Sequence, residues 1–277
     1  MQSSAPGLAG VKHVVAVASG KGGVGKSTTT ANLALALAAQ GYRVGVLDAD
    51  IYGPSMGMML GITEGTRPEQ ISENSMMPVE THGLKVMSIS LLVDEKTAMV
   101  WRGPMASGAL QQLITQTVWG ELDYLLIDMP PGTGDIQLTL SQKVALSGAV
   151  VVTTPQDIAL LDAKKGIEMF RKVNIPVIGV VENMSTHICS ACGHEEHIFG
   201  AGGGERIARE YDTRQLGALP LSLAIREQAD SGKPTVVADP QSVLAGHYLA
   251  VAREVVSALD SAAEAAPSMP QIHVVDD

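Results

Sequence analysis

Short apolar runs recur along the chain, and between them lie longer segments in which apolar residues return every three or four positions. The short runs predict buried strands, and the longer spacing predicts amphipathic helices. Strands are expected at residues 14–18, 43–48, 84–90, 122–128, 149–154, 177–181 and 216–219. Helices are expected at residues 27–40, 104–118, 157–173, 204–211 and 239–263. This alternation predicts an α/β fold, with a doubly wound, mostly parallel sheet flanked by helices.

The length of 277 residues fits one α/β domain, which we assign to residues 11–265. Residues 1–10 and 266–277 are expected to form a flexible lead and a flexible tail. Residues 63–83 are polar and contain Pro68 and Pro78. We therefore expect an insertion or lid there, with little internal order.

A glycine-rich segment joins the first predicted strand to the first predicted helix. Its residues are, in order, Gly20, Lys21, Gly22, Gly23, Val24, Gly25, Lys26, Ser27 and Thr28. The spacing fits the G-x-x-x-x-G-K-[ST] pattern, in which backbone N–H groups surround phosphates at the positive N-terminus of a helix. In this pattern Lys26 reaches the β- and γ-phosphates, and the Ser27 hydroxyl is a ligand of Mg²⁺. The segment predicts a binding site for a nucleoside triphosphate.

Lys21 adds a cation at a position where the basic pattern requires none. Its ammonium group could project across the mouth of the loop toward the phosphates of a facing subunit, as an arginine finger does in trans. A solvated loop lysine is the alternative.

Carboxylates stand at the ends of two predicted strands. Asp48 ends the predicted strand 43–48, Asp50 follows two residues later, and Asp128 ends the apolar run 122–128. Because ligands of open α/β sheets bind at the carboxyl ends of the strands, Asp48 and Asp50 are expected where a phosphate-bound Mg²⁺ would lie. Asp50 is the candidate for positioning the attacking water, and Asp128 for supporting Mg²⁺ directly or through water. An ordinary helix cap is the alternative for Asp128.

Three further positions are candidates for contact with the nucleotide. Residues 129–135 combine prolines with glycines and suit a switch, in which Gly132 brings its N–H close to a γ-phosphate. Asn183 carries an amide that could read adenine or cap a turn. Arg102 could contact phosphate or cap a turn. Since the chain lacks an N-K-x-D element for guanine, ATP is the expected nucleotide.

The formal charge of −10 argues against a broad surface for nucleic acid, which would need clustered lysine and arginine. No apolar run approaches the length needed to span a bilayer, and the N-terminus does not read as an export signal. We therefore expect a cytoplasmic protein with neither nucleic acid nor membrane as a partner.

Cys189 and Cys192 are the only cysteines, and their C-x-x-C spacing favours metal or redox chemistry over a structural disulfide. Zinc sites and cubane clusters usually take four protein ligands, so one chain supplies half a site. A two-fold dimer would bring two pairs together. Alternatively, His187, His194 or His197 completes a zinc site within the chain, or the pair cycles between dithiol and disulfide. The remaining interpretation is that the two cysteines are exposed and have no chemical role.

Together these motifs resemble the Mrp/ApbC family of P-loop ATPases, which are iron–sulfur cluster carriers related more distantly to MinD, ParA and nitrogenase iron protein. The resemblance covers roughly residues 11–260. It rests on GKGGVGKST, DADIYGPS, WRGP, IDMPPGTGD, ENMS, the C-x-x-C and FGAGGGE.

The resemblance implies a homodimer with ATP sandwiched near the interface and Lys21 acting in trans. It also implies a labile [4Fe-4S] cluster that bridges Cys189 and Cys192 of both subunits and is handed to apo-proteins. The function expected from it is a slowly hydrolysing, ATP-dependent cluster carrier. The alternatives are a ParA/MinD-like positioning switch, whose basic face or terminal amphipathic helix the sequence lacks, and an ATPase with a structural zinc at the cysteines.

Overall fold

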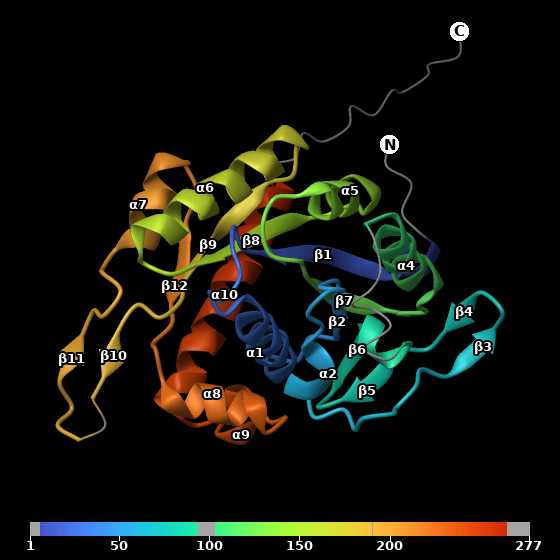
Figure 1. Ribbon diagram of the computed structural model, residues 1–277, viewed down its shortest axis with the longest axis horizontal. Helices are drawn as coiled ribbons and strands as arrows, with labels where there is room; N and C mark the ends of the chain where they lie inside the picture. The colour runs from blue at the N-terminus through green and yellow to red at the C-terminus, as the bar shows by residue number, and fades with distance from the viewer. Residues whose placement is uncertain (1–5, 94–102, 190, 265–277) are drawn as a thin grey trace, which may run out of the picture.

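A computed structural model describes residues 6–93, 103–189 and 191–264, and shows a central eight-stranded sheet in the order β12-β9-β8-β1-β7-β2-β6-β5 (Figure 1). Neighbouring strands pair in parallel except β5, which runs antiparallel to β6 at one edge. The strands are β1 Val11–Ala18, β2 Val44–Asp48, β5 Val79–Thr81, β6 Leu84–Ser88, β7 Leu122–Asp128, β8 Gly148–Thr153, β9 Val177–Glu182 and β12 Gln215–Ala218. The predicted fold class is confirmed.

Both faces of the sheet are buried, which explains why its strands read as continuous apolar runs. Successive side chains of a strand point to opposite faces, so Val15 and Val17 enter one core while Val14 and Ala16 enter the other. The first core is closed by α1 Lys26–Ala39 and α10 Val243–Glu264. The second is closed by α4 Gly103–Gln116, α5 Asp135–Lys143, α6 Asp157–Lys172 and α7 Gly203–Glu210.

Two segments are more ordered than the sequence predicted. Pro6–Leu8 form a short 3-10 helix, and Leu8 is buried, so the flexible lead is wrong for this part of residues 1–10. Within residues 63–83, β3 Gln70–Ser72 pairs with β4 Ser75–Met76, and β5 joins the main sheet. Backbone hydrogen bonds between strands therefore order residues 63–83, although the polar composition of this segment gave no sign of strands. Residues 1–5, the tail 266–277 and Arg102 lie outside the described residues.

Several helices differ from those predicted. The helix expected over residues 239–263 begins at Val243, because Asp239 precedes a proline and Ser242 caps the helix, accepting a hydrogen bond from Ala245 N at 3.1 Å. The structure also contains short helices that the sequence did not predict. They are α2 Met56–Met59, η2 Ile89–Leu91, α5, α8 Leu223–Asp230 and α9 Thr235–Ala238.

Candidate functional site

The phosphate-binding loop lies between β1 and α1, as predicted, and close approaches require two of its glycines. A side chain at Gly20 would place its Cβ 2.0 Å from the backbone oxygen of Asp162 in α6. Gly25 has φ of +80°, and a Cβ there would lie 2.1 Å from Nδ2 of Asn183. The loop is therefore fixed against α6 and against the end of β9, with its backbone exposed at Gly22 and Gly23.

Lys26 and Ser27 converge on the buried carboxylate of Asp128. Lys26 Nζ lies 2.8 Å from Asp128 Oδ1, and Ser27 Oγ donates to Asp128 Oδ2 at 2.7 Å. Thr30, which the sequence reading did not single out, donates to Oδ1 at 2.8 Å. Lys26 and Asp128 are 6% and 0% exposed, so this ion pair is shielded from solvent. A hydroxyl beside a carboxylate is a donor set that suits Mg²⁺.

Asp50 lies at the edge of this cluster, with its Oδ2 at 3.9 Å from Lys26 Nζ. Burial raises the pKa of Asp50, while the Lys26 charge opposes that rise. The carboxylate thus faces the region where the phosphates are predicted, as a residue that orients water would need to.

Asp48 has a different environment from the one expected beside Mg²⁺. Its Oδ2 accepts hydrogen bonds from the backbone N–H of Ser55 and Met56 at 2.9 and 3.1 Å and from the Ser88 hydroxyl at 3.2 Å. Its Oδ1 accepts from the N–H of Asp50 at 3.1 Å. Burial, with the neighbouring charge of Asp128, raises the pKa of Asp48 to about 7. Asp48 therefore anchors the loop that carries Asp50.

The loop after β7 is held by contacts that the sequence reading missed. The N–H of Gly132, predicted to approach a γ-phosphate, donates to the backbone oxygen of Ser19 at 2.9 Å. Gln137 Nε2 donates to the Pro131 oxygen at 2.6 Å. A phosphate can take the Gly132 hydrogen only after the bond to Ser19 opens, so the loop here is in a closed arrangement.

Asn183 contacts the phosphate-binding loop. Its Nδ2 donates to the backbone oxygen of Val24 at 2.8 Å, and its own N–H donates to Thr153 O at 2.7 Å. The side chain is 8% exposed. The amide donor that could read adenine or cap a turn is thus engaged in fixing the loop.

Two more loop residues have identifiable contacts. The backbone oxygen of Thr28 accepts a hydrogen bond from Asn32 within α1 at 3.0 Å. The backbone oxygen of Lys21 accepts one from the Ser19 hydroxyl at 2.9 Å, and the Lys21 side chain is half-exposed.

The two cysteines lie at the tip of a hairpin formed by β10 His187–Ile188 and β11 Glu195–Glu196, which extends away from the sheet (Figure 1). Both thiols are free, and Cys192 is exposed. N–H groups of Ala191 and Cys192 hydrogen-bond to the Cys189 sulfur and lower its pKa. Such bonds favour the thiolate, which is the form that binds metal.

The nearby histidines do not complete a metal site around these cysteines. Nδ1 of His197 lies 2.8 Å from Ser185 O, and Nδ1 of His187 lies 3.3 Å from Leu221 O. Over residues 6–93, 103–189 and 191–264, no three histidine, cysteine or acidic side chains cluster in a way that could hold a metal ion. In the same part of the chain, no helix is both long and apolar enough to cross a membrane.

Comparison with known proteins gives consistent matches. The ParA family described as NUBPL iron-transfer P-loop NTPase matches residues 10–256. An iron–sulfur cluster carrier protein of Pseudomonas fragi is 68% identical over 89% of this chain and 86% of its own length. The mouse iron–sulfur cluster transfer protein NUBPL is 52% identical over 93% of this chain and 81% of its own length.

Solved structures show the same fold. A nucleotide-binding protein from Archaeoglobus fulgidus in complex with ADP superimposes with a TM-score of 0.73 and 38% identity, covering 85% of this chain and 91% of its own. MinD from Pyrococcus furiosus, at 22% identity, covers 88% of this chain and 98% of its own with a TM-score of 0.69.

Proposed function

This chain belongs to the family of NUBPL iron-transfer P-loop NTPases, and we propose that it is an ATP-hydrolysing carrier of an iron–sulfur cluster. Two copies hold a labile [4Fe-4S] cluster between them and pass it to apo-proteins. The names of its relatives support the cargo. The observation that carries the proposal is the exposed hairpin, whose free cysteine pair lies on a nucleotide-binding domain and offers only half of a cluster's ligands.

The nucleotide site divides the work of hydrolysis among a few side chains. Lys26 neutralises charge on the β- and γ-phosphates, and Asp50 aligns the attacking water. Ser27 and Asp128 would hold Mg²⁺, Asp128 directly or through water, since the hydroxyl and the carboxylate lie 2.7 Å apart and both offer hard oxygen donors. When bound, Mg²⁺ supplies positive charge beside the phosphates. Release of Asp128 from Lys26 would free that ammonium group for phosphate.

The cluster site requires a second chain. Two thiolates from each hairpin give the four that a cubane takes, and a two-fold axis brings identical hairpins face to face. The N–H bonds to the Cys189 sulfur favour its thiolate before the cargo arrives. The cluster is cargo in this scheme, so an exposed hairpin tip suits both loading and release.

Nucleotide state and cargo are coupled through the dimer. Lys21 reaches the phosphates of the facing subunit, so ATP draws the two chains together. Loss of the γ-phosphate lets the loop at Gly132 return to Ser19, and the change in dimer geometry alters the grip on the shared cluster.

The test is to measure iron, acid-labile sulfide, zinc and native mass after anaerobic reconstitution of the protein. We expect about four iron and four sulfide per two chains, because a cubane needs four thiolates. Stoichiometric zinc without iron uptake would refute the carrier function and leave a structural metal in its place.

A cysteine variant provides the matched control. Cys189→Ala combined with Cys192→Ala is expected to abolish iron uptake and leave ADP affinity and thermal stability unchanged, because both side chains lie at the tip of the hairpin. If this variant unfolds, the cysteines serve stability rather than cargo.

A further inference from the structure

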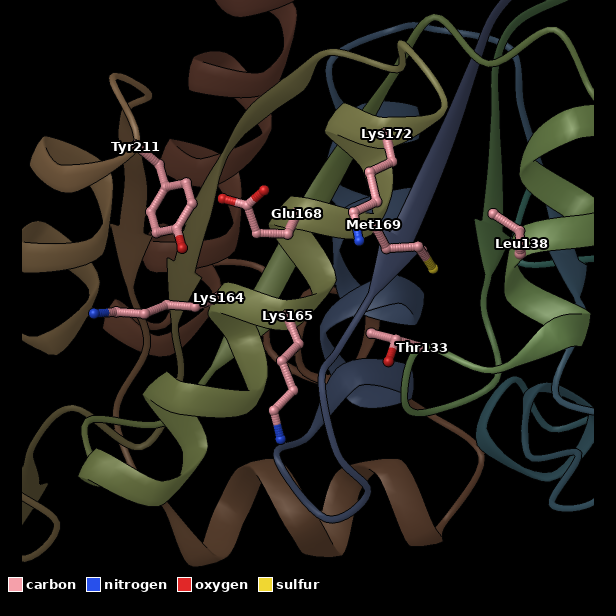
Figure 2. A pocket seen from close by; sticks show the side chains of 8 residues that line it. All are labelled: Thr133, Leu138, Lys164, Lys165, Glu168, Met169, Lys172 and Tyr211. Atoms are coloured by element: carbon pink, nitrogen blue, oxygen red, sulfur yellow. The ribbon is translucent and has the colours of Figure 1, made fainter.

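A shallow hollow of about 480 Å³ lies over the outer face of α6, between Tyr211 on one flank and Thr133 and Leu138 on the other (Figure 2). Its lining includes no residue of the phosphate-binding loop and none of the cysteine hairpin. Apart from Thr133, which belongs to the loop after β7, the hollow is a surface that the proposed ATPase and carrier chemistry does not use.

The floor of the hollow is apolar. Met169 is 8% exposed and belongs to the core beneath, and Leu138 is half-buried on α5. Tyr211 is held on its flank by Arg171, whose guanidinium carbon lies 4.9 Å from the centre of the ring. Side chains of this kind offer fixed apolar contacts to a ligand without the entropic cost of ordering mobile groups.

The rim of the hollow is cationic. Lys164, Lys165 and Lys172 line it, against a single carboxylate, that of Glu168, to which the Tyr211 hydroxyl donates a hydrogen bond. This is a local reversal of sign in a chain whose formal charge is −10. A positive patch on an acidic molecule selects for an anionic ligand, because complementary potentials steer association and like charges repel.

The lysines are available to an incoming anion. Lys165 pairs with Asp162 at 2.9 Å but remains 68% exposed, so that ion pair is weak and exchangeable. Lys164 pairs with Glu210 at 2.6 Å on the side toward α7. Among the residues that the structure describes, Lys172 forms no ion pair. At least two ammonium groups can therefore bind a ligand at little cost.

We propose that this hollow docks a short segment of a partner protein in which acidic and apolar side chains alternate. Carboxylates of the segment pair with Lys165 and Lys172, and its apolar side chains lie on Met169 and Leu138. A peptide fits better than a small molecule, because small-molecule sites enclose most of their ligand, whereas this hollow is shallow and its lysines stand at the rim.

The docked segment would also contact the nucleotide machinery. Thr133 lies in the loop that follows Asp128, and Gln137, in the first turn of α5, fixes that loop through Pro131. A ligand that touches Thr133 therefore favours one arrangement of the loop, and by linkage its own affinity depends on the bound nucleotide.

The test uses a fluorescein-labelled peptide that alternates glutamate with leucine, titrated by fluorescence anisotropy against the intact protein with ADP. We expect saturable binding to the wild type, and at least about tenfold weaker binding to Lys165→Glu combined with Lys172→Glu, because both carboxylate contacts become repulsive. The matched control, Lys143→Glu combined with Lys233→Glu, changes the net charge equally outside the hollow and should bind as the wild type does.

Three results would overturn the proposal. A peptide with glutamine in place of glutamate that binds equally well would show that charge is not recognised. Equal binding by both double variants would place the peptide elsewhere. Competition by millimolar citrate would make the hollow a site for small anions. The ATP affinity and iron content of each variant, measured on the same preparations, keep this outcome separate from that of the carrier function.

Discussion

Asp48 shows how a single buried carboxylate organises the nucleotide site. It is 0% exposed, yet its two oxygens accept three backbone N–H groups and one hydroxyl. These bonds fold the loop that presents Asp50 to Lys26. The same burial, beside Asp128 on the adjacent strand, raises the pKa of Asp48 to about 7. The site thus holds a proton at a pH where an exposed aspartate would have lost it.

This shift predicts a pH dependence of stability. The unfolded carboxyl group titrates near 3.8 and the folded one near 7, so the folded state binds the proton more tightly. Its contribution to stability is complete below the lower value and is lost as the pH rises through the upper one. Without nucleotide, the wild type should lose stability to urea between pH 5 and about 7.5, and Asp48→Asn should lose less.

A surface variant serves as the control for that experiment. Arg43 and Lys12 lower the pKa of Asp123, so Asp123 titrates below this pH window and Asp123→Asn should leave the wild-type loss unchanged. An equal loss in Asp48→Asn and the wild type would contradict the assignment to Asp48.

Asn183 gives a second prediction at this scale. Asn183→Ala removes the bond to Val24 that fixes the phosphate-binding loop, and we expect about tenfold weaker binding of ADP, since a buried hydrogen-bond partner is worth about 1–3 kcal/mol. Titration with both ADP and GDP identifies the cause. A loop role predicts equal losses for both nucleotides, whereas a loss confined to ADP would restore the reading of adenine by Asn183.

At the scale of elements, the hairpin of β10 and β11 is a local structure. Its strands are two residues each, and its tip is closed by Cys189 N to His194 O at 2.9 Å and Gly193 N to Cys189 O at 2.8 Å. At its base, His187 is bridged to Leu221 beyond β12. The tip therefore contributes little to the core, and its residues can be replaced by a different turn.

We predict that replacing residues 189–193 with an Asn-Gly turn abolishes iron uptake while ADP affinity stays within about twofold, because exposed loop tips tolerate such exchange. The melting temperature should change by only a few degrees. The measurements are iron analysis, nucleotide titration and calorimetry. A large loss of stability would show that the tip supports the fold.

The sequence allowed prediction of the elements whose apolar residues or glycines recur at a regular spacing. It did not allow prediction of the features that depend on contacts between residues far apart in the chain. The phosphate-binding loop and the main strands follow from glycine spacing and apolar runs, because the glycines and the buried faces leave little choice. Helices α5 and α8 were missed because they are short and polar. The bonds from Asn183 to Val24 and from Gly132 to Ser19 join residues far apart in the chain, so no local pattern encodes them.

At the scale of the whole molecule, both the proposed nucleotide site and the proposed cluster site would need a second copy of the chain. In the proposal, the cysteine hairpin supplies two of the four ligands of a cubane, and the nucleotide site receives Lys21 from a facing copy. The phosphate-binding loop follows the carboxyl end of β1, and Asp128 stands at the carboxyl end of β7. The hairpin of β10 and β11 follows β9, another strand of the main sheet (Figure 1). One pairing of chains would complete both sites together.

Complementation tests the role of Lys21. Lys21→Ala and Lys26→Ala should each abolish ATP hydrolysis as homodimers. In a mixture, half of the dimers combine the two variants, and each of these has one intact Lys26 that faces an intact Lys21. If Lys21 acts in trans, mixing should restore about a quarter of the wild-type rate. If it acts in cis, mixing restores nothing.

Because the Gly132 N–H already donates a hydrogen bond to Ser19 O, a phosphate that accepts from it must first displace that bond. Exchanging one such bond for another changes the free energy by much less than forming a new one. If Gly132 binds the γ-phosphate as proposed, it would therefore give ATP little advantage over ADP, and the discrimination between them would come from the charged groups around the phosphates. The swap of partners gives this amide two alternative acceptors, Ser19 O of its own chain or the proposed phosphate. The rate of amide hydrogen–deuterium exchange at Gly132, measured with and without nucleotide, would report which acceptor is bound.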